Sequence, residues 1–235
     1  MTGVSGDNSD TPATRADVDL RVLVASPIAD QGVRPLCLPI TMSHAHEAAT
    51  AAKREGIAMA PEAIWWACTK MHQVTATGML LEHAGTALRL SGQPPLSHWP
   101  WNPHLGIGTE GPPSSAGKPP WSTAELVQIQ VAHDGIEDEI EDALAAGLTV
   151  VLTVELTHAF EYPDEDGSIA VPDIRSPAGD YHAVLVVGAV TDATHARRLL
   201  IRNSWGDFWG AGGFGWLPLD YLVANAVQAA VVVPT

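Results

Sequence analysis

A proline- and glycine-rich stretch near the middle of the chain, QPPLSHWPWNPHLGIGTEGPPSSAGKPP (93–120), separates two halves of different character. Proline lacks the main-chain N–H that a helix or a central strand needs, and glycine loses the most conformational entropy when either forms. Neither structure is therefore expected here, and we predict a long surface crossing. The halves on either side must then bury their apolar residues in separate ways.

The half before the crossing has the pattern of helices. Pro39 is tolerated only in a first turn, so the first helix is expected to begin at or just before Cys37. Gly92 is expected to end the last one, because glycine is the usual residue just past a helix C-terminus. The expected helical segments are 37–56, 60–74 and 79–92.

The half after the crossing is dominated by β-branched, strand-like runs. These runs lie at 148–156, 182–190, 197–205 and 230–235. One amphipathic helix is expected within 134–147, where Ile136, Ile140 and Leu144 recur every fourth residue. Helices followed by strands argue for the α+β class, with a helical lobe at about residues 31–110 and a β-rich lobe at about 120–235. A cleft between such lobes is a natural place for chemistry.

Charge and cysteine content exclude several classes of partner and compartment. The chain has 235 residues and a formal net charge of −15, so nucleic acid and anionic membranes are poor partners and basic peptides suit it better. No apolar run reaches the roughly 18 residues that span a bilayer. Residues 1–17 hold almost nothing to bury and carry no export signal, so we expect a disordered leader. Because the chain has only two cysteines, Cys37 and Cys68, a cytoplasmic location is expected.

Three residues have the chemistry and the placement for nucleophilic catalysis. Cys37 stands at a predicted helix start, where unpaired N–H groups and the helix dipole favour a thiolate. His182 opens a strand whose rigid edge would aim its imidazole as a base. Asn203 precedes a glycine-rich turn, and an amide can fix the ring and tautomer of a histidine. Each also has a purely structural alternative, since a lone cysteine is most often a small buried hydrophobe.

Taken together, the motifs resemble those of the papain-like cysteine peptidases. That family carries a Gln-Gly, a nucleophilic cysteine six residues after the Gln, a histidine opening a strand, and Asn-Ser-Trp-Gly, with the His and Asn roughly 130–150 residues after the Cys. The chain offers, in this order, Gln31-Gly32, Cys37, His182-Ala183-Val184 and Asn203-Ser204-Trp205-Gly206. Further matches between about Asp30 and Trp216 are Glu47, Trp99-Pro100-Trp101, Trp209 and Gly213-Phe214-Gly215.

The resemblance implies a papain-like fold, with an N-terminal helical lobe, a C-terminal antiparallel β-barrel-like lobe and the active-site cleft between them. It implies that Cys37 attacks a peptide carbonyl as a thiolate and forms a thioester, with His182 as acid and base and Asn203 as its orienter. Gln31 and the Cys37 main-chain N–H would form the oxyanion hole, and Trp205 would shield the His182–Asn203 hydrogen bond from water. The implied substrate is a peptide or protein, and no cofactor is implied.

Around the nucleophile the chain departs from the family pattern. The family's Cys-Gly-Ser-Cys-Trp is replaced by Arg34-Pro35-Leu36-Cys37-Leu38, so the upstream cysteine and its disulfide are absent, as in simpler bacterial relatives. Cys68 is expected to be a buried core thiol. The family's substrate-binding Gly-Gly is reduced to Gly78, for which an ordinary loop glycine is the alternative. Asp180, two residues before His182, takes the position that lines the main specificity pocket, which implies a preference for a basic substrate side chain.

Several alternatives stay open at this point. A papain-fold protein that binds peptides without cutting them is disfavoured by the intact catalytic set, whereas a transferase or peptide ligase would share the same thioester. The leader is too short for the family's inhibitory propeptide. We therefore expect either a longer natural chain or restraint by a regulatory partner or a narrow specificity. His44 and His46 lie two residues apart and do not share a helix face as metal ligands would, so no metal is expected.

Overall fold

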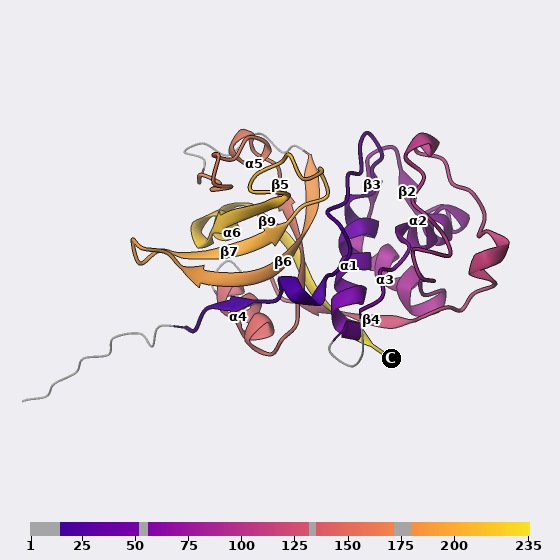
Figure 1. The fold of residues 1–235 in the computed structure, drawn as a ribbon, viewed down its shortest axis with the longest axis horizontal. Coiled ribbons are helices and arrows are strands. Elements are labelled where there is room, and N and C mark those ends of the chain that lie inside the picture. The colour runs from indigo at the N-terminus through magenta and orange to yellow at the C-terminus, as the bar shows by residue number, and fades with distance from the viewer. Residues whose placement is uncertain (1–14, 52–55, 132–134, 172–179) are drawn as a thin grey trace, which may run out of the picture.

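The computed structural model shows an α+β fold with a helical lobe and a lobe built on a β-sheet (Figure 1). Residues 1–14 of the expected leader lie outside the described residues. Its last three residues, in contrast, contact the β-rich lobe, where Asp17 forms an ion pair with Arg197 at 2.7 Å. The ordered domain therefore begins before residue 18. The structure describes residues 15–51, 56–131, 135–171 and 180–235.

The helical lobe contains the three predicted helices. Helix α1 (Cys37–Ala51) begins at Cys37 with Pro39 in its first turn, as expected. Helix α2 spans Pro61–Lys70 and ends earlier than residue 74, because His72 turns the chain with a φ of 57° into the hairpin of β2 (Val74–Thr75) and β3 (Gly78–Met79). Helix α3 spans Leu81–Leu90. It stops before Gly92, where φ is +69° and a Cβ would lie 2.3 Å from the Ser122 carbonyl oxygen.

The crossing at 93–120 has the irregular path that its proline content predicts. Its described helical structure is limited to two short 3-10 turns, η2 (Pro103–Leu105) and η3 (Ser114–Ala116). It also contributes to the core, because Trp99 is only 4% exposed. The Trp99 ring packs edge-to-face against Trp66 and Trp121, with centroids 6.2 and 5.9 Å away. Trp99 thus packs the crossing against α2 of the helical lobe.

The β-rich lobe is built on an antiparallel sheet in the order β4-β9-β5-β6-β7-β8, with β1 paired to β6. Four of its strands were predicted from their β-branched runs, although the run at 197–205 forms a strand only as far as Arg202. The strands are β1 (Val18–Asp19), β4 (Ala124–Ile129), β5 (Val150–Glu155), β6 (Tyr181–Thr191), β7 (Arg197–Arg202), β8 (Phe214–Pro218) and β9 (Ala226–Pro234). The lobe's helical elements are η1 (Arg21–Leu23), α4 (Ile136–Ala145), α5 (His158–Glu161) and α6 (Leu219–Asn225).

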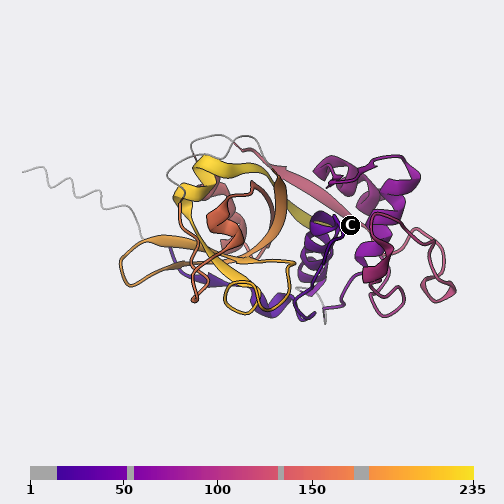
Figure 2. The same cartoon turned by 90° about the horizontal axis from the view of Figure 1, so that it is seen from above.

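Two apolar cores lie on opposite faces of this sheet. One joins α1, α2 and α3 to the sheet through residues such as Met42, Ile64 and Leu185. The other packs α4, α6 and the α5 residue Phe160 against the opposite face. Helix α1 therefore lies between the sheet and the other two helices, as both views show (Figures 1 and 2). The N-terminus of α1 is in this way brought to the boundary between the lobes.

Among the described residues, none of the helices is both long and apolar enough to cross a bilayer.

Candidate active site

Cys37 is held at the first position of α1, where main-chain N–H groups converge on its sulfur. Burial raises the pKa of the Cys37 thiol, and hydrogen bonds from the main chain of Ala183, Leu38 and Cys37 itself lower it. The last two are unpaired helix N-terminal groups, which favour a negative charge. The Ala183 group comes from β6 and places that strand directly against the Cys37 sulfur.

A second hydrogen bond fastens α1 to β6 at the same point. Thr41, one turn beyond Cys37, donates from its hydroxyl to the Ala183 carbonyl oxygen at 3.0 Å. Ala183 thus contacts the sulfur through its N–H and Thr41 through its carbonyl. Because His182 precedes Ala183 in the same strand, this bonding fixes the histidine relative to the cysteine across 145 residues of sequence.

The His182 ring is held by Asn203 in a defined tautomer. The Asn203 Oδ1 atom lies 2.6 Å from His182 Nε2 and also accepts the Ser204 main-chain N–H at 2.8 Å. Since a main-chain N–H can only donate, the atom facing the ring is the oxygen, and Nε2 carries a proton. Nδ1 is then the ring nitrogen that can exchange a proton with a neighbouring group. Burial lowers the pKa of His182 to about 4, and the bond to Asn203 opposes that shift.

Aromatic rings enclose this hydrogen bond. The Trp205 ring is tilted over the His182 ring with centroids 4.4 Å apart, and Phe160 of α5 packs edge-on at 5.9 Å. His182 and Asn203 are 3% and 1% exposed. A hydrogen bond in such a dry environment is stronger than one exposed to water. The Trp205 ring thus covers the His182 ring beside the buried hydrogen bond.

Gln31 is fixed at both ends of its side-chain amide. Its Oε1 accepts a hydrogen bond from the Ser204 hydroxyl at 2.7 Å, and its Nε2 donates to the Arg34 carbonyl at 2.9 Å. The Gln31 main-chain N–H also bonds to the Ser204 carbonyl. Ser204 therefore joins the segment around Gln31 to the segment around Asn203. One N–H of the Gln31 amide is left over by these bonds, as an oxyanion donor requires.

The residues expected to bind substrate lie at the edge of this group. Gly78, in β3, has a φ of +133°, and a Cβ added there would lie 3.7 Å from the carbonyl oxygen of Pro35, two residues before Cys37. Asp180 is exposed, and its carbonyl accepts the Leu156 N–H at 2.8 Å.

Two further residues singled out in the sequence, Glu47 and Cys68, are buried. Glu47 is 1% exposed and takes hydrogen bonds from both the N–H and the hydroxyl of Ser26. Cys68 is fully buried, as predicted.

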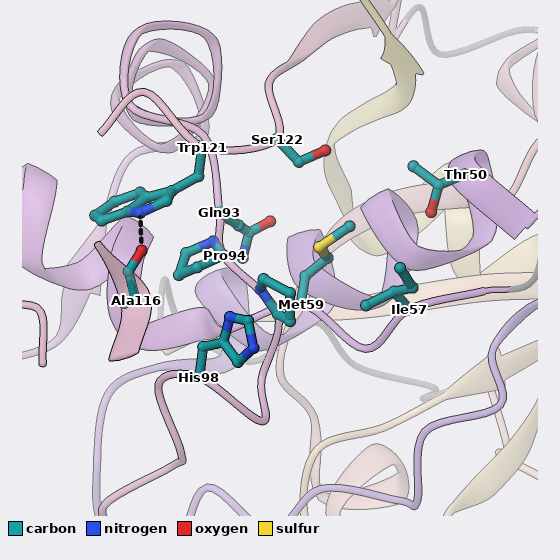
Figure 3. Close-up of a pocket in the computed structure, with 10 residues that line it drawn as sticks. Thr50, Ile57, Met59, Gln93, Pro94, His98, Ala116, Trp121 and Ser122 are labelled. Carbon is teal, nitrogen blue, oxygen red and sulfur yellow. Dashed lines mark hydrogen bonds between the residues drawn. The ribbon is translucent and has the colours of Figure 1, made fainter. Parts of the chain in front are cut away.

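Two cavities have linings that do not include Cys37, His182, Asn203 or Gln31. One, of about 330 Å³, is lined by Met59, Pro94 and Trp121, with the Trp121 indole N–H bonded to the Ala116 carbonyl (Figure 3). The other, of about 470 Å³, borders α1 at Ile40 and His44. Within the described residues, no group of three or more His, Cys, Asp or Glu side chains is placed to hold a metal ion.

A family model described as papain family cysteine protease matches residues 17–233. The chain belongs to the papain family of cysteine proteases. It is therefore a cysteine-type peptidase, acting on peptide or protein substrates. No curated protein matches the chain in sequence.

Solved structures of cysteine proteases show the same fold. The chain is similar to xylellain, a cysteine protease from Xylella fastidiosa, with 21% identity over 93% of this chain and 86% of that one, at a TM-score of 0.73. It is similar to digestive procathepsin L 3 of the Tenebrio molitor larval midgut, with 21% identity over 99% and 73% of the chains and a TM-score of 0.76. It is also similar to Amb a 11, a cysteine protease and major ragweed pollen allergen, in its proform. The identity is 16% over 97% of this chain and 67% of that one, and the TM-score is 0.73.

Sequence reasoning missed three residues that this geometry includes. Thr41 and Phe160 carry no signal beyond their residue type, because their partners are a carbonyl group and a ring on distant elements. Ser204 lies inside the Asn-Ser-Trp-Gly motif, and its position between Asn203 and Trp205 could have marked it. The predicted catalytic residues, Cys37, His182 and Asn203, do lie together with Gln31 at the boundary of the lobes.

Proposed function

We propose that this papain-family peptidase cleaves its substrate with Cys37 as nucleophile, His182 as acid and base, and Asn203 as orienter. One observation carries the proposal: the Asn203 oxygen lies 2.6 Å from His182 Nε2, and the next residue of the strand, Ala183, bonds the Cys37 sulfur through its main chain. The bond to Asn203 engages Nε2 and leaves Nδ1 as the nitrogen that can exchange a proton. A thiol, an imidazole and an orienting amide in this order are the requirements of thiol-based acyl transfer.

The reaction begins with proton transfer from Cys37 Sγ to His182 Nδ1. The thiolate attacks the substrate carbonyl carbon, and the developing oxyanion is held by the Gln31 Nε2–H and the Cys37 main-chain N–H. As the carbon–nitrogen bond breaks, His182 Nδ1 returns its proton to the leaving amine, and a thioester remains on Cys37. Water then attacks the thioester with His182 as base, which releases the carboxylic acid and restores the thiol.

The electrostatics of the site favour the two charges only as a pair. Burial by itself favours a neutral Cys37 and a neutral His182, since it raises the pKa of the first and lowers that of the second. Transfer of a proton from one to the other leaves the net charge of the site unchanged, and the opposite charges then stabilise each other. The main-chain N–H groups at the sulfur and the Asn203 oxygen at the ring both favour the ionised form.

Alkylation of the native protein with iodoacetamide at pH 6, followed by peptide mass spectrometry, tests the ion pair. An ordinary thiol is less than about 1% thiolate at this pH. Cys68 is the internal control, because burial raises its pKa to about 12. We expect rapid labelling of Cys37 alone and slow labelling in a His182→Ala variant. Labelling of Cys37 no faster than that of Cys68 would contradict the assignment.

Substrate choice is proposed to involve Asp180. The carboxylate is exposed close to the start of β6, and an acidic group there favours a basic side chain at the substrate residue just before the one whose carbonyl is attacked. Peptides with Arg or Phe at that position test this. We expect kcat/KM to be at least tenfold higher for Arg, with the preference lost in Asp180→Asn. A clear preference for Phe would exclude this role for Asp180.

We further propose a reducing, cytoplasmic setting of the kind found for simple bacterial members of the family. Both cysteines are unpaired, and the similarity to xylellain from Xylella fastidiosa supports a bacterial relationship. Restraint of activity would then come from narrow specificity or from a regulatory partner.

Added amine nucleophiles test whether water is the normal acceptor of the acyl group. Amide products formed at millimolar amine would indicate a transferase.

A further inference from the structure

Arg34 is a fully buried charge three residues before the nucleophile. Its side chain has no exposed surface, and that of its ion-pair partner Glu62 is 1% exposed. Arg34 lies in the loop that runs from Gln31 to Cys37, so its position sets the path of that loop. A buried guanidinium is retained in a fold only where its hydrogen bonds are met.

All five N–H donors of Arg34 have partners. Glu62 takes two of them, from Nη1 at 2.5 Å and from Nη2 at 3.2 Å. The other partners are carbonyl oxygens of the proline-rich crossing, and the Trp101 ring covers the guanidinium with 4.5 Å between its centroid and Cζ. The carbonyls and their distances are Gly106 at 2.9 Å, Asn102 at 2.8 Å and Gly108 at 3.3 Å. Only the planar, forked head of arginine can make this set of bonds.

The main chain of Arg34 is in turn the anchor of the Gln31 side chain. The Arg34 carbonyl accepts the Gln31 Nε2–H at 2.9 Å, and the Arg34 N–H donates to the Gln31 carbonyl at 3.1 Å. The same Arg34 carbonyl accepts the Leu36 N–H at 2.8 Å. A shift of Arg34 therefore moves the amide that faces the substrate oxygen. Oxyanion stabilisation depends on donors held within tenths of an ångström.

We infer that Arg34 is a positioning residue for the oxyanion hole, because its buried guanidinium fixes the carbonyl that orients Gln31. The inference rests on the proposed function, in which Gln31 supplies one oxyanion donor. Arg34 therefore affects the step in which the oxyanion forms. It does not affect the thiolate of Cys37, which is set by α1, Ala183 and His182.

The test compares peptide hydrolysis with thiol alkylation in an Arg34→Lys variant. Alkylation by iodoacetamide needs the thiolate but forms no oxyanion, so the two reactions separate the two roles. We expect kcat to fall on the order of 10- to 100-fold, with KM changed less than about threefold and the alkylation rate of Cys37 unchanged. Arg197→Lys is the matched control, because Arg197 is also an ion-paired arginine but lies on the β-rich lobe, with Glu141 and Asp17 as partners. This variant should leave kcat, KM and the alkylation rate unchanged.

A double-mutant cycle with Gln31→Ala completes the test. If Arg34 acts through Gln31, Arg34→Lys in the Gln31→Ala background should lower kcat less than about threefold further. Additive losses, equal losses of hydrolysis and alkylation, or an unchanged kcat would each overturn the inference. Should Arg34→Lys fail to fold, Glu62→Gln carries the same cycle, with a smaller loss expected. A wild-type protein whose hydrolysis does not depend on Cys37 would contradict the proposed function instead.

Discussion

At the scale of single residues, the Asn203–His182 hydrogen bond makes the clearest demand on activity. Removing it in Asn203→Ala should lower kcat/KM on the order of 10- to 100-fold, part of the roughly 10²–10⁴-fold that acid–base catalysis supplies. Because this bond raises the pKa of His182, its loss lowers that pKa, and the imidazolium loses its proton at a lower pH. The alkaline limb of the pH–rate profile should therefore move to lower pH.

The matched control is Asn225→Ala, which removes a buried amide that donates to the Tyr221 carbonyl instead. It should cost stability without moving the pH profile. An Asn203→Ala enzyme with the wild-type profile would show that the amide does not act on His182.

The sequence points to the proposed catalytic residues but not to the groups that hold them in place, for a physical reason. Cys37, His182 and Asn203 must be these residue types, so their identities and spacing carry a signal. Three of the partners of Arg34 are main-chain carbonyls, which every residue offers. No pattern of side chains can therefore mark them. The departure at Arg34 from the family pattern is visible in the sequence, whereas the carbonyl groups that its guanidinium binds are visible only in the fold.

At the scale of elements, the close approach of α3 to β4 joins the helical lobe to the sheet. A Cβ on Gly85 would lie 2.8 Å from Leu126 Cδ2 and 3.1 Å from Leu126 Cβ. Gly85→Leu should lower the free energy of unfolding by about 1–3 kcal/mol through overpacking, measured by urea denaturation. Glu82→Leu, exposed on the same helix, is the control and should change it by less than about 0.5 kcal/mol. Equal effects of Gly85→Leu and Glu82→Leu would show that the packing between Gly85 and Leu126 can accommodate a larger side chain.

Strand β4 also shows which elements a sequence pattern reveals. Strand β6 has an unbroken run of buried residues, 182–189, and its apolar sequence predicts a central strand. Among the described strands, β4 pairs with β9 alone, at the sheet edge, and Glu125 and Gln128 within it are exposed. Its sequence therefore lacks an apolar run, and it was not predicted. The helix starts were predicted more closely, since Pro39 and Pro61 mark them.

At the scale of the whole molecule, two buried histidines outside the proposed catalytic pair couple folding to pH. Burial lowers the pKa of His44 to about 3, and it also lowers the pKa of His46. Below pH 6.5 the unfolded chain takes up protons that the folded chain does not. Stability is therefore complete above that pH and is lost as the pH falls. Each histidine should contribute a slope of about 1.4 kcal/mol per pH unit.

Urea denaturation between pH 7.5 and 5 measures this slope, in a window above the range in which ordinary carboxylates titrate. His44→Gln and His46→Gln should each flatten this slope, since each removes one side chain that takes up a proton on unfolding. A free energy of unfolding that does not change over this window would mean that the histidines are protonated in the folded protein.

Arg34 fastens the loop before Cys37 to the crossing by hydrogen bonds and by the Trp101 ring, and to α2 by its ion pair with Glu62. The chain's two thiols are unpaired, and Cys68 is buried beyond the reach of solutes. We therefore expect oxidants and reductants to switch activity through Cys37 while the scaffold stays intact. Mild peroxide should abolish hydrolysis by forming a sulfenic acid, and a dithiol should restore it without refolding, with the melting temperature constant throughout. In such an enzyme the redox state of the surroundings controls the reaction and leaves the architecture unchanged.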